Sequence, residues 1–274
     1  MNRRPFRTGV AIVCVCALMI GAGCGRGPRL RVATWNVAHG RGLAFNQIGL
    51  PRETFEANLR AMAGVLRRER PDVVCLQEAD GASDWSGGFD HVAFLAEAAG
   101  YPFRHHGLHV ETERLGVRLR YGTALLSRLP LREMGLHPFD AEIFDTKGAA
   151  WADVVFGGRT VTVISVHLDF KRASVRCRQV DALVERFQSH DEPLIIAGDF
   201  NCSWGDGEDA LRRIAERLSL RCSGNDGGYT FPSHAPEKRL DWILISEDLE
   251  FVDSRIWPDL CSDHLGVVAT LAWR

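Results

Sequence analysis

Apolar residues follow two different periods along the chain. Residues 30–37 alternate apolar side chains with a period of two, which is typical of a half-buried strand. Residues 53–68 instead repeat apolar side chains every three or four positions, which predicts an amphipathic helix that ends before Pro71. The apolar stripe of this helix consists of Phe55, Leu59, Met62 and Leu66.

The same patterns continue to the C-terminus. We expect further strands at residues 72–77, 123–127, 150–156, 160–167, 193–197, 240–246, 250–256 and 265–272. We expect further helices at residues 91–99, 173–187 and 208–218. Strands recur without a regular strand–helix–strand alternation, and neither an internal repeat nor a linker interrupts them. The pattern therefore predicts one α/β (α+β) domain with mixed sheets over residues 28–274.

The first 23 residues read as a targeting segment. Three arginines precede an uncharged apolar run, residues 9–20, which is too short for a comfortable membrane span. The small residues 21–23 precede Cys24, as in the bacterial lipoprotein signal, although Gly21 stands where that signal usually has an aliphatic residue. We expect lipidation of Cys24 and a membrane-anchored envelope protein; an ordinary secreted protein and an uncleaved anchor are the alternatives.

Composition is that of an ordinary globular protein with 274 residues. The net charge is −2, and removal of residues 1–23 leaves 30 basic and 35 acidic residues, so tight non-specific binding to duplex DNA is not favoured. Of the 33 basic residues only Lys147, Lys171 and Lys238 are lysine. Arginine suits bidentate phosphate recognition, but the composition of the genome is the better explanation of the arginine richness.

Cysteine spacing argues against a structural zinc site. The chain has 8 cysteines and no CxxC pair, and five of them follow Cys24. Cys75 lies in an apolar run and is expected to be a buried free thiol. Export permits disulfides, but the sequence does not determine pairing among Cys177, Cys202, Cys222 and Cys261.

Polar side chains gather where the predicted strands begin or end. Taken singly, an Asp or Asn at such a position is usually a turn or capping residue. Here six separate strand ends carry carboxylate, carboxamide or imidazole groups, the set that phosphoester chemistry with a hard cation requires. These residues are Asn36, Gln77, Glu78, His167, Asp169, Asp199, Asn201, Asp241, Asp263 and His264.

The order of these residues resembles that of the endonuclease/exonuclease/phosphatase family, the DNase I-like superfamily. The resemblance covers about residues 30–273, and each motif is short, so it rests on their order and on their place at strand ends. The matching segments are Thr34-Trp35-Asn36, Leu76-Gln77-Glu78, Leu125-Leu126-Ser127-Arg128, Ser165-Val166-His167-Leu168, Gly198-Asp199-Phe200-Asn201, Thr230-Phe231, Leu240-Asp241-Trp242-Ile243 and Ser262-Asp263-His264.

The resemblance implies a four-layer sandwich, with two mixed sheets face to face and helices on the outer faces. It also implies hydrolysis of phosphoesters with Mg²⁺ or Mn²⁺. By the family pattern Asn36, Glu78 and Asp263 are metal ligands, with Glu78 the main one. Asp199 and Asn201 position or activate the attacking water, His167 and His264 flank the scissile phosphate, and Asp241 orients His264. The identity of the general base stays open.

Several residues receive weaker assignments. Arg128, Arg176 and His39 are candidate substrate-binding residues, and Gln179 could brace the site together with Arg176. The histidines at 105, 106 and 109 could suggest a transition-metal site, but we expect an exposed basic loop. Ala38 and Thr123 depart from the family pattern, and Thr123 puts contacts on the phosphate side in doubt. The aromatic rings of Trp85 and Trp204 could stack on a substrate, although Trp204 is equally well a packing residue.

Four functions are consistent with these features. The first is a metal-dependent phosphodiesterase or phosphatase at the cell envelope, a monomer acting on a small or lipid-borne phosphoester. The second is a secreted or envelope nuclease with the same site. The third is a non-catalytic binding module on the same fold, against which the intact set of polar residues argues. The fourth is an unrelated structural lipoprotein. The sequence does not name the substrate.

Overall fold

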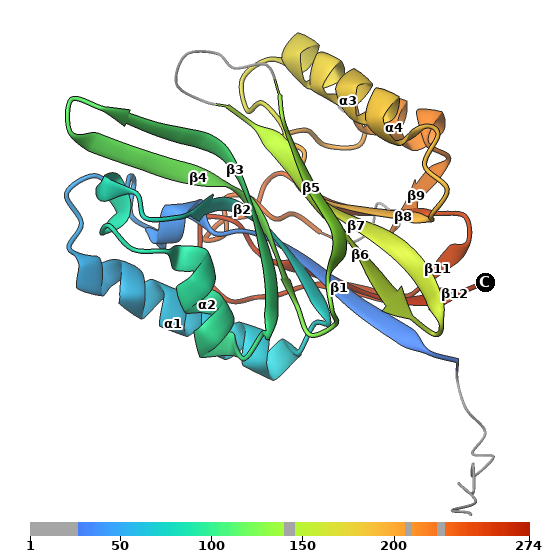
Figure 1. Cartoon of the computed structure of the whole chain (residues 1–274), viewed down its shortest axis with the longest axis horizontal. Helices are drawn as coiled ribbons and strands as arrows, with labels where there is room; N and C mark the ends of the chain where they lie inside the picture. Colours follow the sequence, from blue (N-terminus) through green and yellow to red (C-terminus); the bar gives the residue numbers. More distant parts are fainter. Residues whose placement is uncertain (1–26, 140–145, 206–209, 224–227) are drawn as a thin grey trace, which may run out of the picture.

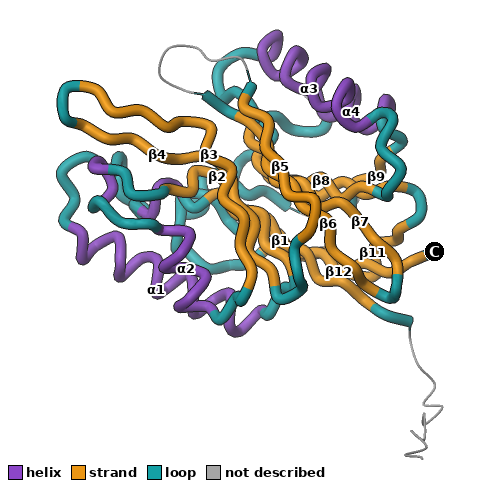
Figure 2. Tube along the Cα trace, in the orientation of Figure 1, coloured by secondary structure: helices purple, strands orange, loops and turns teal. Residues whose placement is uncertain are grey.

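The computed structural model describes residues 27–139, 146–205, 210–223 and 228–274. Two six-stranded sheets pack face to face, with α1 and α2 outside the first and α3 and α4 outside the second (Figures 1 and 2). The fold is therefore the four-layer α/β sandwich that the sequence predicted. The assignment of residues 1–23 to a signal, and Cys24 itself, lie outside the described residues.

The first sheet has the strand order β11-β12-β1-β2-β4-β3. Its strands are β1 (Arg29–Asn36), β2 (Val73–Asp80), β3 (Phe103–Arg114), β4 (Val117–Ser127), β11 (Leu249–Ile256) and β12 (Val267–Trp273). The second sheet has the order β5-β6-β7-β8-β10-β9. Its strands are β5 (Arg132–Pro138), β6 (Gly148–Phe156), β7 (Arg159–His167), β8 (Leu194–Asp199), β9 (Leu220–Cys222) and β10 (Asp241–Ser246).

Four helices cover the outer faces. These are α1 (Arg52–Glu69), α2 (His91–Ala99), α3 (Ala173–Phe187) and α4 (Ala210–Arg217), with two short 3₁₀ turns at Ala38–Gly40 and Asp84–Ser86. The predicted stripe of α1, including Phe55 and Leu66, is fully buried against the first sheet. The described helices match the predicted ranges closely because each carries an unambiguous apolar face. None of them is long and apolar enough to cross a membrane.

Hydrophobic side chains form three layers of core. One lies between the first sheet and α1 and α2, and another between the second sheet and α3 and α4. The third lies between the sheets, where Val32 and Cys75 of the first meet Ile195 and Ile243 of the second. Cys75 is the buried free thiol that was predicted, and the other cysteines in the described residues form no disulfide bonds either. Burial raises the pKa of the Cys75 thiol, which makes it inert.

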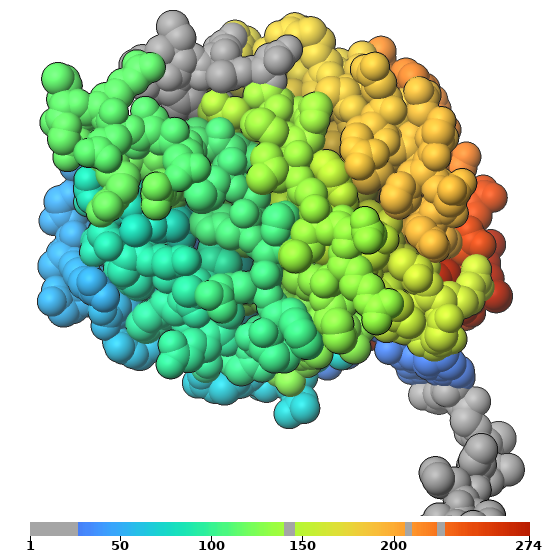
Figure 3. All heavy atoms as spheres, in the orientation of Figure 1, coloured from blue at the N-terminus to red at the C-terminus, as the bar shows by residue number. Residues whose placement is uncertain are grey.

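The largest departure from the sequence prediction is the hairpin of β3 and β4. Only residues 123–127 were expected to be a strand, whereas the hairpin spans residues 103–127 and protrudes at one margin of the molecule (Figures 1 and 3). The expected exposed loop with His105, His106 and His109 is therefore wrong. All three lie on β3, and His109 is buried with its Nε2 atom 2.9 Å from Oγ1 of Thr123.

Strand direction explains where a site can form. Each sheet has a central parallel pair, β1 with β2 and β7 with β8. The carboxyl ends of parallel strands meet at the same edge, so Asn36 lies near Glu78, and His167 lies beside Asp199. Strands β10 and β12 run antiparallel to β8 and β1, and their first residues therefore reach this edge. Because the sheets face each other, all these ends converge on one place.

Candidate active site

Asp199 lies at the centre of the convergent polar groups. It ends β8 and is 1% exposed. Its Oδ2 atom accepts a hydrogen bond from Nδ2 of Asn36 at 3.0 Å, across the interface between the two sheets, and its Oδ1 accepts one from the Asn201 backbone N–H at 2.9 Å. Burial, together with the nearby Asp241 carboxylate, raises the pKa of Asp199 to about 7 against the opposing effect of His264. A carboxylate in this pKa range suits proton transfer near neutrality.

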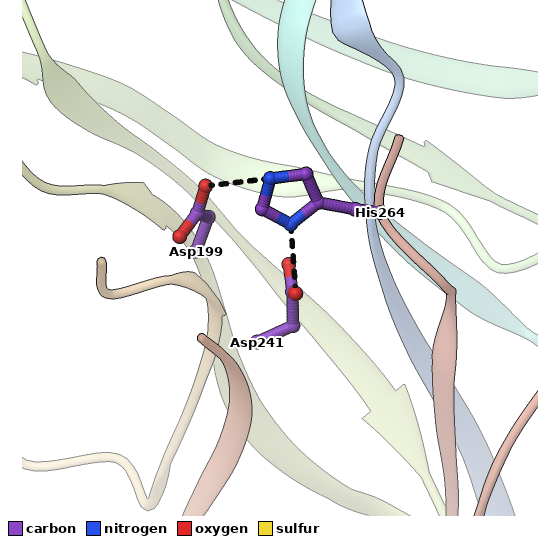
Figure 4. Close-up of side chains that lie close together, drawn as sticks. All are labelled: Asp199, Asp241 and His264. Carbon is purple, nitrogen blue, oxygen red and sulfur yellow. Dashed lines mark hydrogen bonds and ion pairs between the residues drawn. The ribbon is translucent and has the colours of Figure 1, made fainter. Parts of the chain in front are cut away.

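Asp241 and His264 form a buried pair directly beside Asp199. Oδ2 of Asp241 lies 2.9 Å from Nδ1 of His264, and Nε2 of the same ring lies 3.7 Å from Oδ2 of Asp199 (Figure 4). Burial opposes a charge on the ring, but the carboxylates of Asp241 and Asp199 outweigh it and raise the pKa of His264 to about 10. The structure thus brings Asp241 beside His264, as the sequence led us to expect, and makes the ring a cation.

His167 stands across Asp199 from this pair and has the opposite protonation. Its Nε2 atom lies 3.5 Å from Oδ2 of Asp199 and 4.0 Å from Oε1 of Glu78. Burial, with the additional charges of Lys147 and His264, lowers the pKa of His167 well below its ordinary value despite the nearby Glu78 carboxylate. The two histidines that the sequence paired therefore differ, because only His264 has its own buried carboxylate partner.

Asn36 and Asn201 hold the groups around Asp199, and only Asn36 does so from the other sheet. The Oδ1 atom of Asn36 accepts a hydrogen bond from the Ala38 backbone N–H at 2.9 Å, while its amide group donates to Asp199. Asn201 has a φ of +51°, a left-handed conformation that Asn tolerates, and its Nδ2 donates to the Leu168 carbonyl at 3.0 Å. Both side chains thereby fix the geometry around Asp199.

Glu78 presents a carboxylate that the protein itself does not hydrogen-bond. The pairing of β2 with β4 is irregular between Leu76 and Ala79, and Glu78 has a φ of +50°. Such a bulge redirects a side chain, at a cost that functional sites commonly carry. The side chain is 21% exposed, and its nearest charged neighbours are imidazole nitrogens at 3.4 and 4.0 Å. Among the described residues no group donates a hydrogen bond to it.

The charge of Glu78 is nevertheless maintained. Burial favours the neutral acid, but His39, Lys147 and His167 surround the carboxylate and hold its pKa below the ordinary value. A largely buried anion without hydrogen bonds normally has a bound cation as its partner. Glu78 therefore fits a divalent metal.

The remaining predicted metal ligand, Asp263, has a protein partner. Its Oδ2 atom lies 2.5 Å from Nη2 of Arg41, and Nη1 of Arg41 donates to the Ala44 carbonyl at 2.7 Å. Neighbouring contacts hold this loop, because Oγ of Ser262 donates to the Asn36 carbonyl at 2.7 Å. Asp263 is thus close to the end of β1 but already neutralised in part by Arg41.

Within the described parts of the chain, one group of acidic and histidine side chains, Asp199, Asp241 and His264, places its potential ligand atoms within 4.8 Å of one another. Metal binding to His requires a neutral ring with a free lone pair. Here one nitrogen of His264 is bonded to Asp241, the other faces Asp199, and its pKa is raised to about 10. These three side chains therefore suit proton transfer better than metal binding.

His39, which the sequence indicated only as a candidate substrate-binding residue, contacts two acidic side chains. It lines the cavity, but its Nδ1 lies 2.6 Å from Oδ1 of Asp80, and its Nε2 lies 3.4 Å from Oε2 of Glu78. Oδ2 of Asp80 accepts hydrogen bonds from Nε1 of Trp85 at 2.8 Å and from the Ser86 hydroxyl. The Trp85 ring packs edge-on against the His39 ring, with 5.1 Å between their centres, and it does not line this cavity.

Of the residues with weaker assignments, Arg176 and Gln179 lie near the site and Arg128 does not. Arg176 and Gln179 brace the loop after β7, since Nη1 of Arg176 donates to the Asp169 carbonyl at 2.8 Å and Oε1 of Gln179 accepts from the Asp169 N–H at 2.8 Å. Arg128 is a wrong prediction. It follows β4, which runs antiparallel to β2, and therefore lies beside Pro71 at the start of β2, the end opposite Glu78.

A cavity of about 600 Å³ exposes these groups to solvent. His39, Glu78, His167, Asp199, Asn201, Asp263 and His264 all line it, together with Arg176. Three further lining residues, Lys147, Lys171 and Lys238, escaped attention as site residues because lysine alone carries no motif. Arg41 and Asp80 were also missed, and only the position of Asp80 two residues after Glu78 could have indicated it.

The chain is similar in sequence to a known protein. The chain is 25% identical over 174 residues to Protein angel of Drosophila melanogaster; the match covers 57% of this chain and 47% of that protein. The chain thus spans about half the length of this curated relative.

Solved structures share the fold. An endonuclease/exonuclease/phosphatase from Beutenbergia cavernae matches with a TM-score of 0.70 and 24% identity, over 90% of this chain and 72% of that one. The structure of D. rerio TDP2 complexed with single strand DNA product matches with a TM-score of 0.63 and 17% identity, over 89% of this chain and 99% of that one. The model of the endonuclease/exonuclease/phosphatase family matches residues 33–264. The chain therefore belongs to this family, whose members generally hydrolyse phosphoester bonds.

Proposed function

We propose that the protein is a divalent-metal-dependent phosphoester hydrolase that uses Mg²⁺ or Mn²⁺. One observation carries the proposal. The proton-transfer group of Asp199, His264 and Asp241 shares a single cavity with Glu78, a carboxylate that lacks hydrogen bonds from the described residues. An acid–base group next to a carboxylate whose oxygens accept no hydrogen bond from the described residues suits metal-assisted attack on a phosphate.

Glu78 would be the principal ligand of the metal, with Oδ1 of Asn36 and the carboxylate of Asp263 as secondary oxygens. Mg²⁺ keeps several waters and uses only one or two protein carboxylates, so this sparse oxygen set suits it. When bound, the metal neutralises charge on the phosphate oxygens and makes phosphorus more electrophilic.

Side chains of the protein transfer the proton and bind the phosphate oxygens. Asp199 accepts a proton from a water held against Asn201, while the water oxygen forms a bond to phosphorus and the bond to the leaving oxygen breaks. The leaving oxygen takes a proton from solvent. The cationic ring of His264 donates a hydrogen bond to a non-bridging oxygen where negative charge increases. His167, which is neutral, donates a second hydrogen bond without adding charge.

The test is hydrolysis of bis-p-nitrophenyl phosphate by the purified protein with Mg²⁺, with Mn²⁺ and with EDTA. We expect turnover that depends on metal and that is lost in His264→Ala. Full activity of His264→Ala would overturn the mechanism. Metal binding without turnover of phosphoesters would favour a non-catalytic binding module on the same fold.

A nuclease with the same site is the second candidate. The fold match to TDP2 with a DNA product favours it, whereas the net charge of −2 does not favour strong contacts to a nucleic acid backbone. Cleavage of single-stranded DNA with a steep dependence on salt would support the nuclease. Indifference to DNA, combined with turnover of small esters, would support a phosphodiesterase or phosphatase for small or lipid-borne substrates.

We further propose that the protein is an exported, monomeric envelope lipoprotein anchored through Cys24. The support is the sequence of residues 1–24 alone. Full-length protein should partition with membranes, and Cys24→Ser should not be processed as a lipoprotein. Soluble wild-type protein in the periplasm or medium, without lipid, would instead identify an ordinary secreted protein.

A further inference from the structure

The three lysines of the chain, far apart in sequence, line one cavity. Arginine occupies 30 of the 33 basic positions, so arginine is the default cation of this protein. Lys147, Lys171 and Lys238 nevertheless all line the cavity that contains Asp199 and His264. They come from three different places: the residue before β6, the loop after β7, and the segment that precedes β10.

Local structure holds each lysine at the cavity. The backbone N–H of Lys171 donates to Oδ1 of Asp169 at 2.9 Å, in the turn that precedes α3. The backbones of Lys238 and Phe231 exchange two N–H···O=C hydrogen bonds, of 2.9 and 3.0 Å. The Phe231 ring packs on the His264 ring, with 4.8 Å between the ring centres. Lys147, which is 8% exposed, extends its charge towards Glu78 and His167.

Aromatic rings accompany these cations. The Nζ atoms of Lys171 and Lys147 lie 4.7 and 5.7 Å from the centre of the Phe170 ring. Phe170 is 52% exposed although it lines the cavity. A half-exposed ring close to two ammonium groups can bind an organic group of a ligand, while the ammonium groups bind its anion.

The charges exceed what one scissile phosphate needs. His264, and the metal proposed at Glu78, already neutralise one phosphate. Lys171 and Lys238 are exposed side chains, and among the described residues neither forms an ion pair. Lysine serves as a compact point charge for phosphate and adapts to several positions of the anion. Two exposed ammonium groups that line the cavity therefore suit a second anionic group of the substrate.

We propose that the substrate carries a second phosphate group, bound by Lys171 and Lys238 while the scissile phosphate lies at Asp199 and His264, with Lys147 between the two positions. This inference rests on the proposed hydrolase function. It narrows the preferred substrate class to compounds with at least two phosphates. A simple diester with a single charge still occupies the scissile position and is hydrolysed, but it binds more weakly.

The experiment separates binding from turnover. Binding of inorganic phosphate and inorganic pyrophosphate to the full chain is measured by calorimetry, in EDTA and at constant ionic strength. Pyrophosphate has two linked phosphates and is the probe for the second position. We expect it to bind at least about tenfold more tightly than phosphate, in line with an added charge-assisted contact.

Matched variants locate the effect. In the double variant Lys171→Met and Lys238→Met, the preference for pyrophosphate should fall by about tenfold or more, while replacement by arginine should retain most of it. Arg132→Met removes one charge at the start of β5, where Arg132 lies opposite Asp153 of β6 in the strand register, far from the site, and should change neither affinity. Melting temperatures check folding.

Two results would overturn the inference. One is equal affinity for phosphate and pyrophosphate, and the other is a double variant that behaves like Arg132→Met. Hydrolysis of bis-p-nitrophenyl phosphate is measured in parallel. An inactive protein that still shows lysine-dependent preference for pyrophosphate would refute the proposed hydrolase but not the second anionic position. An active protein without the preference would refute only that position.

Discussion

Nδ1 of His39 lies 2.6 Å from Oδ1 of Asp80, and Nε2, the other nitrogen of the ring, lies 3.4 Å from Oε2 of Glu78. Asp80 is fully buried. Burial opposes a charge on the ring, but the carboxylates of Asp80 and Glu78 outweigh it and raise the pKa of His39. Asp80 and His39 thus form a chain of contacts that orients Glu78, the proposed metal ligand.

This relationship predicts that Asp80→Asn weakens metal binding without removing a ligand. The loss of an outer contact that orients a ligand typically costs about 10- to 100-fold in metal affinity or activity. We expect the Mn²⁺ concentration for half-maximal hydrolysis to rise in that range. Asp84→Asn, which removes an exposed acid of the same loop, is the control. An unchanged metal dependence in Asp80→Asn would remove Asp80 from this role.

Glu78→Gln should be more severe. The amide has the shape of the carboxylate but no charge, and the loss of a charged ligand should cost roughly a hundredfold or more in rate. Activity at saturating metal is the measurement, with Asn36→Ala expected to lose less. If Glu78→Gln keeps most of its activity, the metal lies elsewhere.

Asp241→Asn should reduce the rate through His264. The amide no longer supports the cationic ring, so we expect a loss of about tenfold to a thousandfold with little change in melting temperature. His264→Ala should be at least as damaging, and the double variant little worse, because residues that act as a unit are not additive. Losses that multiply in the double variant would mean that Asp241 acts independently of His264.

Arg128→Met should affect stability and not activity. The Arg128 guanidinium lies 5.0 Å from the centre of the Tyr101 ring and donates to the Pro71 carbonyl at 3.3 Å, far from the cavity. Loss of these contacts should cost about 1 kcal/mol in the free energy of unfolding. The comparison of kcat/KM with urea denaturation checks this. A drop in kcat/KM at unchanged stability would restore Arg128 as a substrate-binding residue.

The burial of His109 predicts loss of stability in acid. Burial lowers the pKa of His109 to about 3, whereas the unfolded chain has the ordinary pKa of about 6.5. Between these values the unfolded chain binds more protons, so the free energy of unfolding falls as pH falls from about 6.5 towards about 3. In His109→Gln this decrease should be smaller by an amount on the order of a few kcal/mol.

Urea denaturation at a series of pH values measures the effect. The free energy of unfolding should change less steeply with pH in His109→Gln than in the wild type. The slope should not be zero, because burial also lowers the pKa of His91 and His106. Parallel curves for the two proteins would show that His109 is not buried in the neutral form.

Much of the fold was predictable from local periodicity. The helix at 53–68 and the strand at 30–37 appeared in the structure as α1 and β1 within a residue or two, since their apolar faces have unambiguous periods. The hairpin of β3 and β4 was mostly missed. Its outer half extends past the core, so residues such as Leu115 and Val117 are exposed and lack the alternation that burial would impose.

The sequence by itself determined the carboxylates, amides and imidazoles of the site, because these belong to motifs at strand ends. It did not determine which of these groups contact one another. Packing of one sheet on the other placed Asn36 of β1 against Asp199 of β8, and of the two histidines it gave only His264 a carboxylate at hydrogen-bond distance. Such contacts join residues distant in the chain, and no local pattern encodes them. The antiparallel direction of β4 likewise moved Arg128 away from the site, and tertiary structure alone gathered the three lysines around one cavity.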